Sequence, residues 1–79
     1  MKKRFYWSYR RFGTAPKYEF WLRGEDGLYC RMAIFCPTYR SYSLILPTEI
    51  VKQTFPEQIK TSEVMKKYVE TLLRLKGLI

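Results

Sequence analysis

The side chains that carry out most enzyme chemistry are scarce in this sequence. It has no histidine and two cysteines, Cys30 and Cys36, among its 79 residues. Without histidine the commonest general base is missing, and neither cysteine stands beside a base in a recognisable motif. Glu19 could still serve an acid–base or metal site, because the other acids of the first half are turn residues. We expect a protein that is not an enzyme, with no catalytic residues and no cofactor.

The two cysteines do not complete a metal site or a disulfide framework. A structural zinc ion takes four ligands, and the chain has no histidine to add to its two thiols. If both lie on one extended strand, six residues hold Cys30 and Cys36 about 20 Å apart. A disulfide needs Cα atoms about 4.4–6.8 Å apart. We expect two reduced thiols and no metal, with an intermolecular zinc site or disulfide as alternatives.

Basic and aromatic residues are abundant in this sequence, and they alternate along its first half. The chain carries 15 Lys and Arg against 7 Asp and Glu, a net charge of +8, and it contains 7 Tyr, 5 Phe and 2 Trp. Most of the aromatic residues and nine of the basic ones lie in the first half. Eight surplus charges repel one another, which a purely structural domain has no need of. Proteins that bind nucleic acids combine such charge with rings on which bases stack.

Each feature also has a plainer structural explanation. Tyr and Trp stabilise thin cores through their large area, and strands favour aromatic residues in any case. Arginines along exposed strands protect edges from aggregation. Packing is therefore the simpler explanation for any single ring, whereas the joint concentration of charge and rings favours a binding surface.

The first half of the chain alternates in the way that β-strands do. Apolar and polar side chains take turns along 5–10, 17–23, 28–35 and 40–46, and Gly or Pro residues separate these segments. The connections are too short for parallel crossovers, so neighbouring strands must be antiparallel. Residues 1–46 are therefore predicted to form a curved antiparallel sheet of three to four strands.

The second half changes period. Pro47 at a first helical position predicts a short helical turn over 47–55. Thr61 or Ser62 can cap a stronger helix over 61–77, with Gly77 as its stop. Its apolar stripe consists of Met65, Tyr68, Leu72, Leu75 and Ile79, widened by Val64, Val69 and Leu73. We predict a single α+β domain over 1–79, with this amphipathic helix packed on one face of the sheet.

Successive side chains of a strand point to opposite faces of the sheet, so the parity of a residue's position decides whether it faces the helix or lies on the face that the helix leaves uncovered. The helix is expected to cover three sets, which are Phe5, Trp7 and Tyr9, then Tyr18, Phe20 and Leu22, then Leu28, Cys30, Met32 and Ile34. The opposite parity in the first strand would move Arg4 and Arg10 to the helix side. The predicted nucleic-acid-binding residues are Arg4, Tyr6, Arg10, Arg11, Lys17, Trp21, Arg23, Tyr29, Arg31 and Arg40. The cations would contact phosphates, the rings of Tyr6, Trp21 and Tyr29 would stack, and Lys2 and Lys3 would join Arg4 in an N-terminal arm.

The expected partner is DNA or RNA, single- or double-stranded. The alternative is a small accessory or inhibitory protein of the virus or mobile-element type that docks on an acidic surface of a protein or nucleoprotein. The charged start Met1–Arg4 is not followed by the apolar segment of a signal peptide, because further charged residues interrupt the chain first. No apolar run approaches the roughly 18 residues that a membrane span needs. We therefore expect a cytoplasmic monomer or homodimer that binds no membrane.

Overall fold

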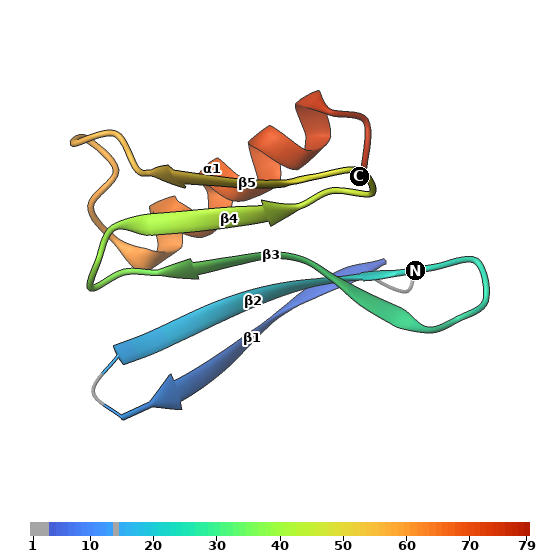
Figure 1. The fold of residues 1–79 in the computed structure, drawn as a ribbon, viewed down its shortest axis with the longest axis horizontal. Coiled ribbons are helices and arrows are strands. Elements are labelled where there is room, and N and C mark those ends of the chain that lie inside the picture. Colours follow the sequence, from blue (N-terminus) through green and yellow to red (C-terminus); the bar gives the residue numbers. More distant parts are fainter. Residues whose placement is uncertain (1–3, 14) are drawn as a thin grey trace.

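The computed structural model describes residues 4–13 and 15–79, which form five strands followed by a helix (Figure 1). The elements are β1 (Phe5–Phe12), β2 (Ala15–Arg23), β3 (Tyr29–Cys36), β4 (Ser41–Ile45), β5 (Ile50–Thr54) and α1 (Ser62–Leu75). The strands pair antiparallel in the order of the sequence. The predicted α+β class is confirmed, but the sheet has five strands rather than three to four.

The additional strand is β5, so the expectation of a helical turn over 47–55 is wrong. Leu46 donates its N–H to the carbonyl oxygen of Glu49 at 2.8 Å, which turns the chain back on itself. Ile50 then pairs with Ile45, and the strand continues to Thr54 beside β4. β-Branched side chains such as Ile50 and Val51 suit a strand, and pairing with β4 outweighs the local helix-start signal of Pro47.

The predicted parity holds for β1 and β2. Trp7 pairs with Phe20, and Phe5 pairs with Leu22. All four pack in or against the hydrophobic core under α1. Tyr9 has the same parity but lies toward the end of the strand, where it is 53% exposed.

The predicted parity is wrong for the second part of β3. Phe20 pairs with Ala33 while Trp21 pairs with Arg31, so Met32 is an extra residue in a β-bulge. Because side chains alternate between faces, one extra residue reverses every position after it. Ala33 therefore enters the core, whereas Ile34 pairs with Glu19 on the other face.

The helix α1 packs through a stripe whose centre is rotated from the predicted one. Met65, Val69 and Leu73 are buried against the sheet, while Leu75 is 78% exposed. They meet core residues supplied by β2, β3, β4 and the segment after β5, namely Phe20, Ala33, Phe35, Tyr42, Leu44 and Phe55. Burial raises the pKa of the Tyr42 hydroxyl above its usual 10.0, and neighbouring Tyr68 adds to this shift.

The predicted C-terminal helix is present, although it spans Ser62–Leu75 rather than 61–77, and its caps explain its ends. The Thr61 hydroxyl accepts a hydrogen bond from the N–H of Val64 at 3.2 Å. At the other end Gly77 has φ 74°, a conformation that glycine adopts without strain. The N–H of Leu78 then reaches the carbonyl oxygen of Leu73 at 3.0 Å. This hydrogen bond closes a Schellman cap.

Candidate nucleic-acid interface

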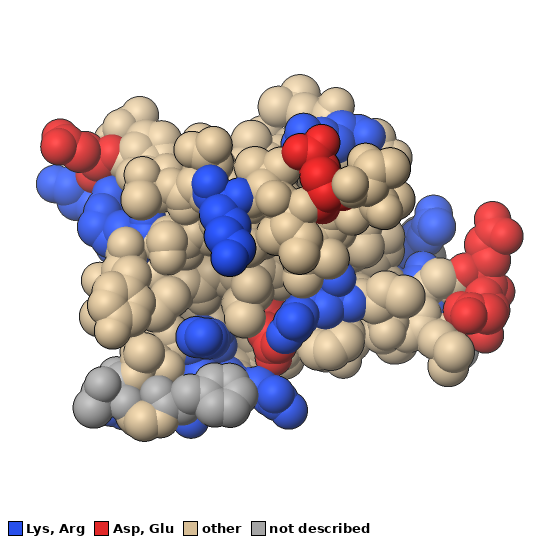
Figure 2. Space-filling view, viewed as in Figure 1, with Lys and Arg blue, Asp and Glu red and all other residues tan. Residues whose placement is uncertain are grey.

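The face of the sheet opposite α1, called here the open face, carries the cationic side chains. By strand register it includes Arg4, Tyr6, Ser8, Arg10, Lys17, Glu19, Trp21, Arg23, Tyr29, Arg31, Ile34, Ser43 and Lys52. Six of these residues are basic and one is acidic. Figure 2 shows an acidic group over the β1–β2 region with basic groups on both sides of it. No helix or strand within residues 4–13 and 15–79 covers this face.

Two pairs of like-charged residues lie across from each other, one between β1 and β2 and the other between the residue just before β1 and the end of β2. Arg10 is the register partner of Lys17. The N–H of Arg23 donates to the carbonyl oxygen of Arg4 at 2.7 Å, which extends the same pairing by one position. Like charges at opposed positions destabilise a sheet. For Arg10, the nearby Glu19 carboxylate offsets part of this repulsion.

Glu19 lies between these pairs and holds two arginines in place. It is 3% exposed, and its Oε2 lies 2.7 Å from Nη1 of Arg31. Its Oε1 lies 3.6 Å from Nε of Arg10 and accepts a hydrogen bond from the Ser8 hydroxyl at 3.4 Å. A buried carboxylate is stable only when it is paired in this way. Glu19 therefore orients Arg10 and Arg31, whose side chains remain 61% and 44% exposed.

Tyr6, Trp21 and Tyr29 form what we call the aromatic cluster, close to the β2–β3 hairpin. The rings of Tyr6 and Trp21 are nearly parallel, 11° apart with centroids 6.3 Å apart, and Tyr29 meets Tyr6 edge-on at 4.9 Å. The Trp21 indole donates to the Ser8 hydroxyl at 2.9 Å, which links the cluster to Glu19. These rings lie outside the hydrophobic core, in contrast to Trp7, whose indole donates to Glu70 on α1 at 2.7 Å.

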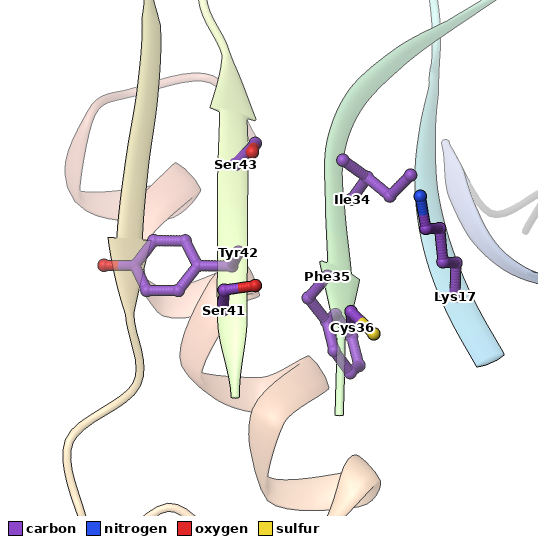
Figure 3. A pocket seen from close by; sticks show the side chains of 7 residues that line it. All are labelled: Lys17, Ile34, Phe35, Cys36, Ser41, Tyr42 and Ser43. Carbon is purple, nitrogen blue, oxygen red and sulfur yellow. The ribbon is translucent and has the colours of Figure 1, made fainter. Parts of the chain in front are cut away.

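A shallow hollow of about 120 Å³ lies farther along the open face, between β2, β3 and β4. Its lining consists of Lys17, Ile34, Phe35, Cys36, Ser41, Tyr42 and Ser43 (Figure 3). Figure 3 shows the Ser41 and Ser43 hydroxyls on the same side of β4, toward β3. Sequence reasoning missed these serines, although their two-residue spacing in a strand was the available signal. They add neutral hydrogen-bonding groups beside Lys17.

Two predicted site residues lie apart from the open face. Arg11 follows the parity of Tyr9 and pairs with Pro16. Arg40 lies in the turn between β3 and β4 with φ 53°, and its guanidinium donates to the carbonyl oxygen of Pro56 at 2.7 Å. This hydrogen bond links the segment after β5 to the turn between β3 and β4, which is a structural role for Arg40. Lys2 and Lys3 lie outside the described residues.

Both thiols are free, Cys30 exposed and Cys36 buried. Among residues 4–13 and 15–79 there is no group of three or more acidic or Cys side chains that could hold a metal ion. No helix in that part of the chain is both long and apolar enough to cross a bilayer.

Replacing Glu19 by glutamine is expected to destabilise the fold by about 1–3 kcal/mol. The amide keeps the shape but removes the negative charge that pairs with Arg10 and Arg31. The loss stays moderate because both arginines can be rehydrated. Urea unfolding measures it, with Glu63→Gln as the matched control, since the Glu63 side chain is 82% exposed and lies 3.6 Å from Lys66. Equal effects of the two substitutions would contradict the anchoring role of Glu19.

Comparison of the chain with protein-family models, with curated proteins and with solved structures finds no match in any of the three. The chemistry of the open face is therefore the basis for assigning a function.

Proposed function

We propose that this protein is a small, non-enzymatic nucleic-acid-binding protein that uses its open face. The observation that carries the proposal is the alignment of Arg4, Arg10, Lys17, Arg23 and Arg31 with the aromatic cluster on one uncovered sheet surface. Phosphates would lie against the cations, while bases would contact the rings.

Electrostatics supports a polyanion as the partner. Phosphates bound among the side chains of Arg4, Arg10, Lys17 and Arg23 would be attracted to a surface on which cations outnumber the Glu19 carboxylate. Counterions released from the nucleic acid would add to the binding free energy. Lys17 and the serines of the hollow offer an additional contact for one phosphate farther along the face.

The test is a titration of the protein with labelled single-stranded and duplex DNA and RNA, followed by fluorescence anisotropy at two salt concentrations. We expect binding that persists at about 0.15 M salt and weakens steeply as salt rises. Binding that disappears at that ionic strength for every nucleic acid would refute the proposal. The positive charge would then favour an acidic protein surface as the partner, to be sought by pull-down with the intact chain.

A further inference from the structure

The aromatic cluster places two tyrosine rings where a ligand can reach them. Tyr6 is 44% exposed and Tyr29 is 41% exposed, and both lie on the face that no described element covers. Tyrosines that serve the core are placed differently, since Tyr42 is 7% exposed beneath α1. Adjacent exposed rings bordered by cations are typical of a surface with a binding partner.

Contacts within the protein also order the rings of the aromatic cluster before any ligand binds. The Trp21 indole is fixed by the Ser8 hydroxyl at 2.9 Å, and Tyr6 lies nearly parallel to Trp21. Tyr29 in turn packs against Tyr6, with the two ring planes 75° apart and the centroids 4.9 Å apart. Rings that are already ordered lose little conformational entropy when a ligand stacks on them.

Base faces, rather than base edges, match what the open face offers. Sequence readout of base edges relies heavily on Asn, Gln and uncommitted Arg side chains. The chain has no Asn, and its two glutamines, Gln53 and Gln58, lie outside β1, β2 and β3. Arg31 and Arg10 are paired with Glu19, at 2.7 and 3.6 Å, and the proposed function assigns Arg4 and Arg23 to phosphates. The aromatic cluster has no such limitation, because every base presents a π-face.

In a duplex the faces of the bases are covered by neighbouring bases, and exposing one costs a few kcal/mol. A ring lying on a sheet can reach an unpaired base without that cost. From the exposed cluster we infer that the preferred ligand is single-stranded nucleic acid, with unpaired bases stacking on Tyr6 and Tyr29. This inference rests on the proposed function, and it specifies which form of nucleic acid the open face binds.

The experiment compares affinities for one oligonucleotide sequence, single-stranded and annealed to its complement, at the same salt concentration. Tyr6→Ala/Tyr29→Ala is expected to weaken single-strand binding about 25-fold or more, about fivefold for each ring, without changing the salt slope. Tyr9→Ala/Tyr39→Ala is the matched control, because both tyrosines are exposed, at 53% and 69%, away from the cluster. The control should bind like the unaltered protein.

Circular dichroism establishes that each variant is folded, and Tyr6→Leu/Tyr29→Leu replaces the alanine pair if that pair unfolds. Tighter binding of the single strand, with a loss specific to the Tyr6 and Tyr29 variant, would support the inference. Equal or tighter binding of the duplex, or equal losses in both double variants, would overturn it while leaving the proposed function standing. Absence of salt-dependent binding to any nucleic acid would overturn both.

Discussion

The Arg10→Ala/Arg23→Ala variant is expected to bind nucleic acids of every sequence about 10–100-fold more weakly than the unaltered protein. Its plot of log affinity against log salt should be less steep by about one to two units. Both arginines lie on the open face, and Arg10 remains 61% exposed beside Glu19, so phosphates can reach both side chains. The loss should not depend on sequence, because phosphates are the same in every nucleotide. Anisotropy titrations across a salt series give both quantities.

The matched control removes the same amount of charge from another part of the molecule. Arg74 and Lys76 are exposed at the C-terminal end of α1, on the opposite side of the sheet. Arg74→Ala/Lys76→Ala therefore has the same net charge as the open-face variant but leaves the open face intact. If the two double variants lose affinity equally, binding depends on net charge alone and the assigned surface is wrong.

Leu73→Asp is expected to unfold the protein. Leu73 is fully buried at the centre of the contact between α1 and the sheet. An aspartate there would lose the apolar contacts and place an unpaired charge in the core, at a cost of several kcal/mol. Small domains are stable by only about 5–15 kcal/mol in total. Near-ultraviolet circular dichroism and thermal unfolding would show the loss of fixed tertiary structure.

Leu75→Asp makes the same chemical change two residues later and should leave the protein folded. Leu75 is 78% exposed, although the spacing of apolar residues had predicted that it belongs to the buried stripe. A cooperative thermal transition in Leu73→Asp at the temperature seen for Leu75→Asp would show that α1 does not supply the core. The pair of variants thus tests the observed orientation of the helix against the predicted one.

Local patterns were sufficient to predict much of this fold. The alternation in β1 and β2 predicts which residues face the helix, because a strand without irregularities keeps its parity. Thr61 and Gly77 predict the ends of α1 through capping chemistry that involves only neighbouring residues. These features depend on few long-range contacts, so a single sequence contains the information.

The errors arise where pairing between strands decides the structure. The bulge at Met32 depends on the register between β2 and β3, and no local signal in 28–35 indicates it. Pro47 is compatible with both a helix start and a turn, and the presence of β4 as a partner selects the strand at Ile50.

In the candidate site too, local patterns predict some features, while others depend on contacts between distant residues. The sequence predicts a cationic face bearing Tyr6, Trp21 and Tyr29, and the structure brings these three rings together. It does not predict that Glu19 is buried beneath Arg10 and Arg31, because that arrangement requires side chains from three strands to converge. Nor does the sequence predict that the Arg40 guanidinium donates a hydrogen bond to the carbonyl oxygen of Pro56, which is distant in the sequence.

The two tryptophans can show whether the open face binds nucleic acid. Trp21 lies on the open face. Trp7 lies on the opposite face, where its indole N–H donates a hydrogen bond to Glu70. Their indole N–H signals can be followed separately by nuclear magnetic resonance while an oligonucleotide is added. We predict that the Trp21 signal moves together with the backbone amides of β1, β2 and β3, while the Trp7 signal and α1 stay in place. Shifts centred on Trp7 and α1, with the Trp21 signal unmoved, would show that nucleic acid binds on the helix side and not on the open face.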